Sequence, residues 1–147
     1  MDTHVVHVLS GLLKTQHLEI LRDLETLKGL LNKPFSRKSL QTIEIILHAL
    51  DQRVLLHLTQ EDQLLYPKLL NHRHEGLRHL GGTFMAEMGN VAEDFSGYIR
   101  RWRSEEVLTI HWNHFVEESL AIASRLVWRI EREEKELFPL LDAMDWE

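Results

Sequence analysis

Apolar residues recur at spacings of three and four along nearly the whole chain, which is the pattern of helices that bury one face. These stripes predict four helices, over residues 3–32, 37–70, 76–103 and 105–142. Ser36 and Ser104 stand where they would cap the second and fourth helices. Short connections make neighbouring helices antiparallel. The expected fold is therefore all-α, an antiparallel up-down-up-down four-helix bundle.

The second half of the chain repeats the pattern of the first. The segment from Val54 to Pro67 recurs from Leu126 to Pro139, at an offset of 72 residues, and the apolar stripes of the first and third helices match at an offset of 71. The bundle is therefore predicted to be a duplicated helical hairpin. A chain of 147 residues fits one domain, so we expect a single domain over residues 1–147.

Several inward-facing positions carry metal-ligand chemistry in place of hydrocarbon. His17 lies on the stripe of the first helix, and His57 and Glu61 lie one helical turn apart on the second. Glu133 is the repeat of Glu61. One isolated His–Glu pair would indicate only a buried hydrogen bond. Histidines and carboxylates that face inward from several helices instead indicate a metal centre inside the bundle.

Two positions of the repeat have lost this chemistry. Met88 stands where the first half has His17, and Arg129 stands where it has His57. With the residue types of the first half in both places, the layer would hold four histidines and two glutamates. That set suits two iron ions bridged by carboxylates.

The arrangement resembles the hemerythrin-like (HHE cation-binding) family, over essentially the whole chain. The resemblance rests on one histidine in the first helix, a His-x-x-x-Glu motif before Tyr66 and Pro67, and a degenerate second copy. It implies a non-haem di-iron centre that binds oxygen or serves sensing, storage or stress roles. It also implies that four residues occupy ligand positions, namely His17, His57, Glu61 and Glu133. Met88 and Arg129 stand at two further positions where the family pattern has a histidine ligand.

The direction of the Arg129 side chain distinguishes two hypotheses for the metal centre. Arginine keeps its proton and is no metal ligand, and a guanidinium about 4 Å from a dication costs roughly 8 kcal/mol at an effective dielectric near 20. The leading hypothesis is a depleted centre without a cofactor, in which Arg129 forks onto Glu61 and Glu133 and Met88 packs against His17. The alternative is a single non-haem iron ion, with Arg129 turned outward, on His17, His57 and Glu61.

The composition of the chain argues against several classes of partner, cofactor and chemistry. A net charge of −6 argues against nucleic acid as a partner, and the absence of cysteine excludes disulfides, iron–sulfur clusters and thiol catalysis. No apolar run approaches the roughly 20 residues of a membrane span, and no signal peptide is visible. We expect a cytoplasmic binding or regulatory protein that contacts a protein partner or a second copy of itself. The competing hypothesis is a functional non-haem iron protein that binds oxygen or another small diatomic ligand. Nothing adds to the case for an enzyme.

Other charged and histidine-rich segments have simpler interpretations. The charge run over residues 131–136 is expected to be a solvated helix face, apart from Glu133. Five histidines are expected near one end of the bundle, where solvated turns are favoured over a surface metal site: His4, His7, His72, His74 and His79.

Overall fold

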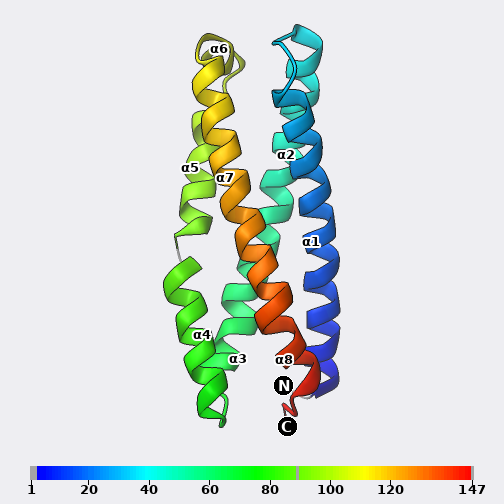
Figure 1. Ribbon diagram of the computed structural model, residues 1–147, viewed down its shortest axis with the longest axis vertical. Coiled ribbons are helices and arrows are strands. Elements are labelled where there is room, and N and C mark those ends of the chain that lie inside the picture. Colours follow the sequence, from blue (N-terminus) through cyan, green and yellow to red (C-terminus); the bar gives the residue numbers. More distant parts are fainter. Residues whose placement is uncertain (1–2, 89, 147) are drawn as a thin grey trace.

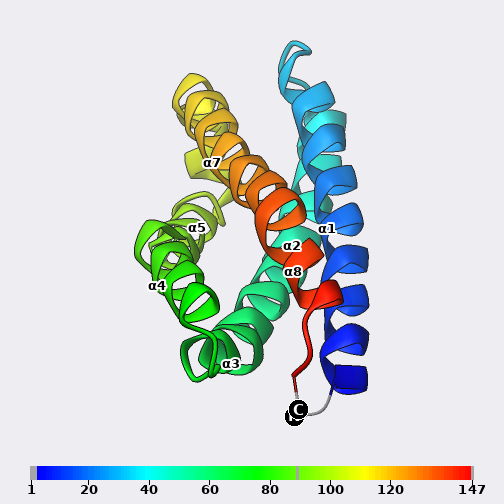
Figure 2. The same cartoon turned by 60° about the horizontal axis from the view of Figure 1, so that its bottom comes forward.

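The computed structural model describes residues 3–88 and 90–146, and the side chain of Met88 lies outside what it describes. Within these ranges the regular structure is helical and no strand forms, so the predicted all-α helical bundle is confirmed. Figures 1 and 2 show α1 (Thr3–Leu31) beside α2 (Arg37–Gln60), and α4 (Glu75–Met88) nearly in line with α5 (Val91–Arg101). The long helix α7 (Trp112–Arg132) runs between these two sides.

The predicted helix starts are found in the structure, but two of the predicted helices are interrupted. The side-chain oxygens of Ser36 and Ser104 accept hydrogen bonds from backbone N–H groups three residues later, so both predicted caps are confirmed. The predicted third helix is divided into α4 and α5, with a turn at Asn90, a residue of low helix propensity. A short helix, α6 (Glu105–Ile110), precedes α7 and is separated from it by a turn at His111.

In the second and fourth predicted helices, a wider π-helical turn precedes the proline, and the chain remains helical beyond it. These turns and the short helices that follow are η1 (Glu61–Leu65) with α3 (Tyr66–Leu70), and η2 (Glu133–Leu137) with α8 (Phe138–Ala143). Each turn closes when the next residue donates its N–H to the carbonyl of Glu61 or Glu133, five residues back. The wider turn makes room for the rings of Pro67 and Pro139, which would clash with a preceding α-helical turn.

A polar layer divides the apolar core into two clusters. One cluster fills the upper part of the molecule in Figure 1 and includes Ile43, Leu50 and Phe115. The other fills the lower part and includes Leu13 and Phe84. The buried polar and charged residues between them include Gln16, His17, His57, Glu61, Arg129 and Glu133.

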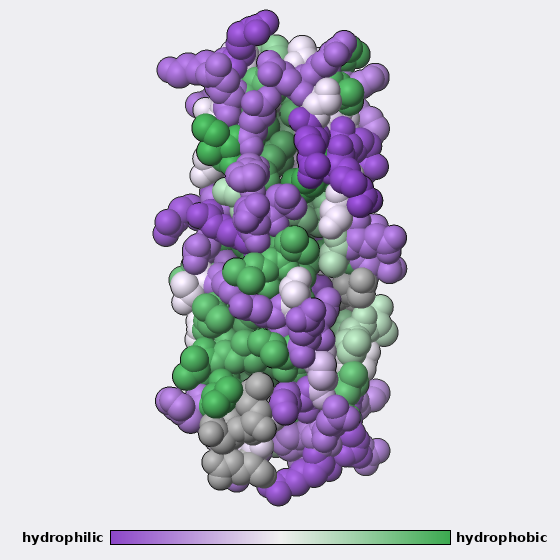
Figure 3. All heavy atoms as spheres, turned by 180° about the vertical axis from the view of Figure 1, so that it is seen from behind, coloured by the Kyte–Doolittle hydropathy of each residue, from purple (hydrophilic) through white to green (hydrophobic). Residues whose placement is uncertain are grey.

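The outer surface is not uniformly polar. Figure 3 shows apolar side chains gathered on the lower half of the back of the molecule, among polar ones. Exposed apolar residues of α1 and α2 include Val8, Leu12 and Leu56. Among the described residues, no helix combines the length and the apolar character that crossing a membrane requires.

Candidate metal centre

Four of the predicted site residues converge in the polar layer. His17 comes from α1 and His57 from α2, while Glu61 and Glu133 are the first residues of the two π-helical turns. One ligand atom of each lies within 4.8 Å of those of the other three, and all four residues are buried. In the described part of the chain, no other histidine and carboxylate side chains form such a group. The π turns thus start where the side chains must reach the core, a frequent location for functional residues.

The ligand atoms of this cluster face a common point. The Nε2 atom of His17 lies 3.0 Å from Nε2 of His57 and 2.9 Å from Oε1 of Glu133. The Nε2 atom of His57 lies 3.3 Å from Oε1 of Glu61 and 3.7 Å from Oε1 of Glu133. Donor atoms that share one ion, with bonds of about 2.1 Å, lie about 3.0 to 3.4 Å apart. The spacing therefore fits a single metal ion.

The outer ring nitrogens of both histidines are engaged elsewhere. Nδ1 of His17 donates to Oε1 of Glu134 at 2.8 Å, and Nδ1 of His57 donates to Oε1 of Gln16 at 2.8 Å. Gln16 is itself held by a 2.7 Å hydrogen bond to Gln60. Carboxylate and amide oxygens only accept, so each Nδ1 carries the ring hydrogen. Such outer partners fix the tautomer of a histidine that binds metal through its other nitrogen.

With this tautomer, no positive charge lies at the buried point that the two Nε2 atoms and Glu133 face. Neutral rings would point two Nε2 lone pairs and the Glu133 carboxylate at one buried point, where they repel. One metal ion would contact all three groups, whereas one proton on an imidazole would supply positive charge to the layer and relieve part of the repulsion. The donor set of two imidazoles and a carboxylate suits zinc, iron or another first-row divalent metal. The residues present therefore fit one ion.

Arg129 occupies the other side of the layer. It is buried, and its Nη2 donates to Oε1 of Glu61 at 2.9 Å, while its Nε lies 3.7 Å from Oε2 of Glu133. The side chain thus points inward, with a closer contact to Glu61 than to Glu133. A second dication beside Glu61 would adjoin this guanidinium and be repelled by it. The residues present therefore do not fit the dinuclear centre that the resemblance implies.

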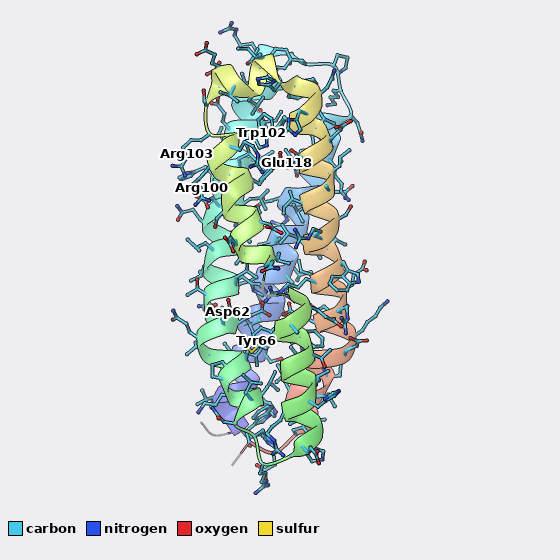
Figure 4. All side chains as sticks on the ribbon, turned by 90° about the vertical axis from the view of Figure 1, so that its left-hand side faces the viewer. Asp62, Tyr66, Arg100, Trp102, Arg103 and Glu118 are labelled. Carbon is cyan, nitrogen blue, oxygen red and sulfur yellow. The ribbon has the colours of Figure 1, made fainter. Side chains whose placement is uncertain are left out.

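Glu133 is the most heavily contacted carboxylate of the site. Tyr66, which the sequence pattern places only among apolar positions, donates its hydroxyl to Oε2 of Glu133 at 3.0 Å. In Figure 4, Tyr66 lies at the level of α4. Although burial opposes it, the polar contacts with Glu61, His17 and His57 and the charge of Arg129 lower the pKa of Glu133 well below its usual range. Glu133 is therefore the permanently charged carboxylate of the centre.

Glu61 and His57 hold their protons more tightly than usual. Burial and the charge of Glu133 raise the pKa of Glu61 to about 7. Burial disfavours the charged form of His57, but the attraction of Glu61 and hydrogen bonds to both glutamates outweigh it and raise the pKa of His57 to about 9. Without a metal, a proton on His57 therefore supplies the missing cation.

The metal-free protein is expected to lose stability as the pH rises above about 6.5. A histidine whose pKa is raised on folding stabilises the folded state fully below its unfolded pKa of 6.5, and this contribution disappears as the pH rises through about 9. The loss is roughly 3 kcal/mol of unfolding free energy. The raised pKa of Glu61 acts in the same direction at lower pH, between 4.5 and about 7.

Urea unfolding with a chelator present, at a series of pH values, measures this loss. The His57→Gln variant is the control, because it removes the titrating ring. Its unfolding free energy should change little across the alkaline range. An equally steep pH dependence in both proteins would contradict the assignment to His57.

The expectation for Glu134 needs correction, whereas those for the histidines at one end and for Met88 do not. Glu134 is not part of a purely solvated face, because its carboxylate reaches back to His17. The five histidines at one end of the bundle, for which solvated turns are favoured, form no metal-capable group in the described part of the chain, and His72 packs edge-on against Trp146. The expected contact of Met88 with His17 lies outside the described side chains, so it stays a prediction.

Comparison with known proteins agrees with the geometry. The family model for the hemerythrin HHE cation-binding domain matches residues 8–141, nearly the whole chain. Searches of curated proteins and of solved structures find no significant match. The matched range includes every residue of the buried His–Glu cluster. On this evidence, the chain belongs to the hemerythrin HHE cation-binding domain family.

Proposed function

We propose that this chain is a binding or regulatory protein with a depleted hemerythrin-like centre, which holds one metal ion and excludes a second. His17, His57 and Glu133 would hold the ion, and Arg129 would take the place of the second one. The fold in this proposal is an antiparallel up-down-up-down four-helix bundle made of a duplicated hairpin. The two π turns, which begin at the equivalent residues Glu61 and Glu133, support the duplication.

One observation carries the proposal. Two histidine Nε2 atoms and one glutamate oxygen face the same buried point, at separations that suit a shared ion, while both outer nitrogens are held by other side chains. Orienting two imidazoles in this way costs side-chain entropy, and a metal ion would offset that cost.

Several side chains around the centre would hold the metal ligands in place. Glu134 and Gln16 would fix the two imidazoles, and Tyr66 would fix Glu133 by holding its second oxygen. Arg129 would hold the Oε1 atom of Glu61, which also lies 3.3 Å from Nε2 of His57, and so compete with the ion for this oxygen. When bound, non-haem iron supplies a coordination position for oxygen or another small diatomic molecule. A ligand-binding or sensing role would follow from that position.

A metal-free centre is the second candidate. The raised pKa of His57 favours it, because an imidazolium at this position supplies positive charge to the same buried layer. In that state Arg129 and the proton on His57 would balance Glu61 and Glu133. The function would then be carried by surfaces that bind a protein partner or a second copy, including the exposed apolar side chains of α1 and α2.

Metal stoichiometry tests the proposal. Protein freed of metal is titrated anaerobically with Fe²⁺, and separately with Zn²⁺, and bound metal is measured by elemental analysis after desalting. We expect a single equivalent per chain. Two equivalents would refute the exclusion of a second ion, and none would favour the metal-free candidate. The variant His114→Ala, which changes an exposed histidine, is the control and should bind as the unchanged protein does.

A further inference from the structure

The outward side of α1 carries apolar residues that the described chain leaves uncovered. Its exposed residues, which we call the α1 outer face, are Val8, Gly11, Leu12, Thr15 and Leu18. Spacings of three and four residues place them on one side of the helix. The side chains of Val8, Leu12 and Leu18 are 58%, 44% and 66% exposed. Figures 1 and 2 show α1 at the edge of the molecule, with no helix of the described chain outside it.

This part of α1 has almost no charge. Asp, Glu, Lys and Arg make up 27% of the chain, yet Lys14 is the only one of them between Thr3 and Leu18. The Nζ atom of Lys14 is held by Asp142 of α8, 2.5 Å away. The hydroxyl of Thr15 donates to the carbonyl of Gly11 in the same helix, so it needs no outside partner. The α1 outer face can therefore be buried without leaving a charge or a hydroxyl unpaired.

The fold of the chain itself does not require glycine at position 11. A Cβ atom on Gly11 would meet no atom within 4 Å outside its own stretch of helix, and Gly11 does not have a positive φ. Glycine weakens the middle of a helix relative to alanine, but it lets another backbone approach closely. A second helix could thus cross α1 at Gly11 and contact Val8, Leu12 and Leu18 around the crossing point.

The neighbouring side of α2 enlarges this surface. Gln16 of α1 is hydrogen-bonded to Gln60 of α2. The two helices run in opposite directions (Figure 1), which brings Leu64, 43% exposed, to the same level as Leu12. The segment from Thr3 to Leu18 is about 24 Å long, and two adjacent helices are about 20 Å wide. Two copies joined through this surface would bury about 1,000 Å² in total, near the lower limit for a specific interface.

We propose that the α1 outer face binds the same face of a second copy of this chain. In a symmetric dimer the same patch meets itself, which sets like charges against each other on a charged surface but not on this one. The net charge of −6 makes two copies repel each other elsewhere. A partner of different sequence is selected largely by complementary charges, and this face offers none. The proposal rests on the surface-binding candidate above, for which it names the partner, and does not depend on a metal ion at the centre.

A pair of charge variants tests the proposal directly. Sedimentation of the full chain, with a chelator present, should show a monomer–dimer equilibrium with a Kd of about 10 to 100 μM. Leu12→Lys and Leu12→Glu should each raise this Kd more than about tenfold, because each places like charges opposite one another. An equal mixture of the two variants should regain the dimer, since opposite charges then meet. Ile45→Lys and Ile45→Glu change a residue of α2 that is 71% exposed and lies outside the face, so they are the matched controls and should leave the Kd unchanged.

Two glycines of the same helix test the close approach. Gly11 and Gly29 are both exposed, and a Cβ atom on either would meet nothing within 4 Å. Gly11→Gln should weaken the dimer about tenfold, because its side chain fills the crossing point. Gly29→Gln lies outside the face and should leave the dimer unchanged. Neither variant should unfold more easily than the unchanged protein, because glutamine favours helix more than glycine does.

Three results would overturn the proposal. A chain that stays monomeric up to about 500 μM would have no useful affinity for itself. A dimer that both Leu12 variants abolish, but that their mixture does not regain, would not pair the same face of each copy. A monomer that binds phosphatidylcholine vesicles, and loses this binding with Leu12→Lys, would assign the face to a membrane surface. Because the chelator keeps the protein free of metal, failure of the proposed metal centre would leave this test intact.

Discussion

Replacing Arg129 by alanine is expected to lower the free energy of unfolding of the metal-free protein by about 3–5 kcal/mol near pH 8. Arg129 is buried and donates to Glu61, which is fully buried and lies beside a second carboxylate, Glu133. Without the guanidinium, Glu61 must either keep an uncompensated charge in the core or take up a proton against the solution pH. Both outcomes cost free energy in the folded state only.

The same variant should bind metal more tightly. The guanidinium repels a dication in the layer, and its removal also frees Glu61 as a further carboxylate ligand. Stability without metal and affinity for metal should therefore change in opposite directions, which simple damage to the fold would not produce. Urea unfolding in the presence of a chelator and titration with Zn²⁺ measure the two quantities.

The matched control is Arg125→Ala, which breaks a surface ion pair with Asp94. Such exposed pairs contribute about 0–1 kcal/mol, so this variant should remain close to the unchanged protein. An Arg129→Ala protein as stable as the Arg125→Ala protein would contradict the assignment of Arg129 as the internal counter-ion.

Replacing Glu133 by glutamine is expected to weaken metal binding more than about 100-fold, because loss of an outer partner alone commonly costs 10- to 100-fold. Glu133 is the only carboxylate with an oxygen within hydrogen-bond distance of His17 Nε2 among the described residues, and it is the permanently charged one. Glutamine keeps the size of the side chain but provides a neutral oxygen. A competition titration against a coloured chelator measures the affinity.

Two neighbouring glutamates calibrate this result. Glu134→Gln weakens the acceptor for the outer nitrogen of His17 and should have an intermediate effect, while Glu131→Gln changes an exposed side chain and should have none. Circular dichroism of each variant checks the helices. If Glu133→Gln bound metal as tightly as Glu131→Gln, the ion would have to lie outside the buried cluster.

The sequence by itself determined the helices and the direction of their faces. Apolar spacings of three and four have only one structural period that fits, and Ser36 and Ser104 cap where they do because a helix start leaves N–H groups unpaired. The same spacing places His17, His57, Glu61 and Glu133 on inward faces. Because they interrupt apolar stripes at equivalent levels, their meeting in one layer could be predicted without coordinates.

Tertiary structure alone decided how these side chains use one another. The sequence cannot tell that Glu134, on an exposed face, reaches His17, or that the Tyr66 hydroxyl ends on Glu133, since both depend on the packing of helices distant along the chain. The π turns were equally invisible. Periodicity fixes the direction of a residue to within a helix face, whereas hydrogen bonds and metal binding require atoms to meet within a few tenths of an ångström.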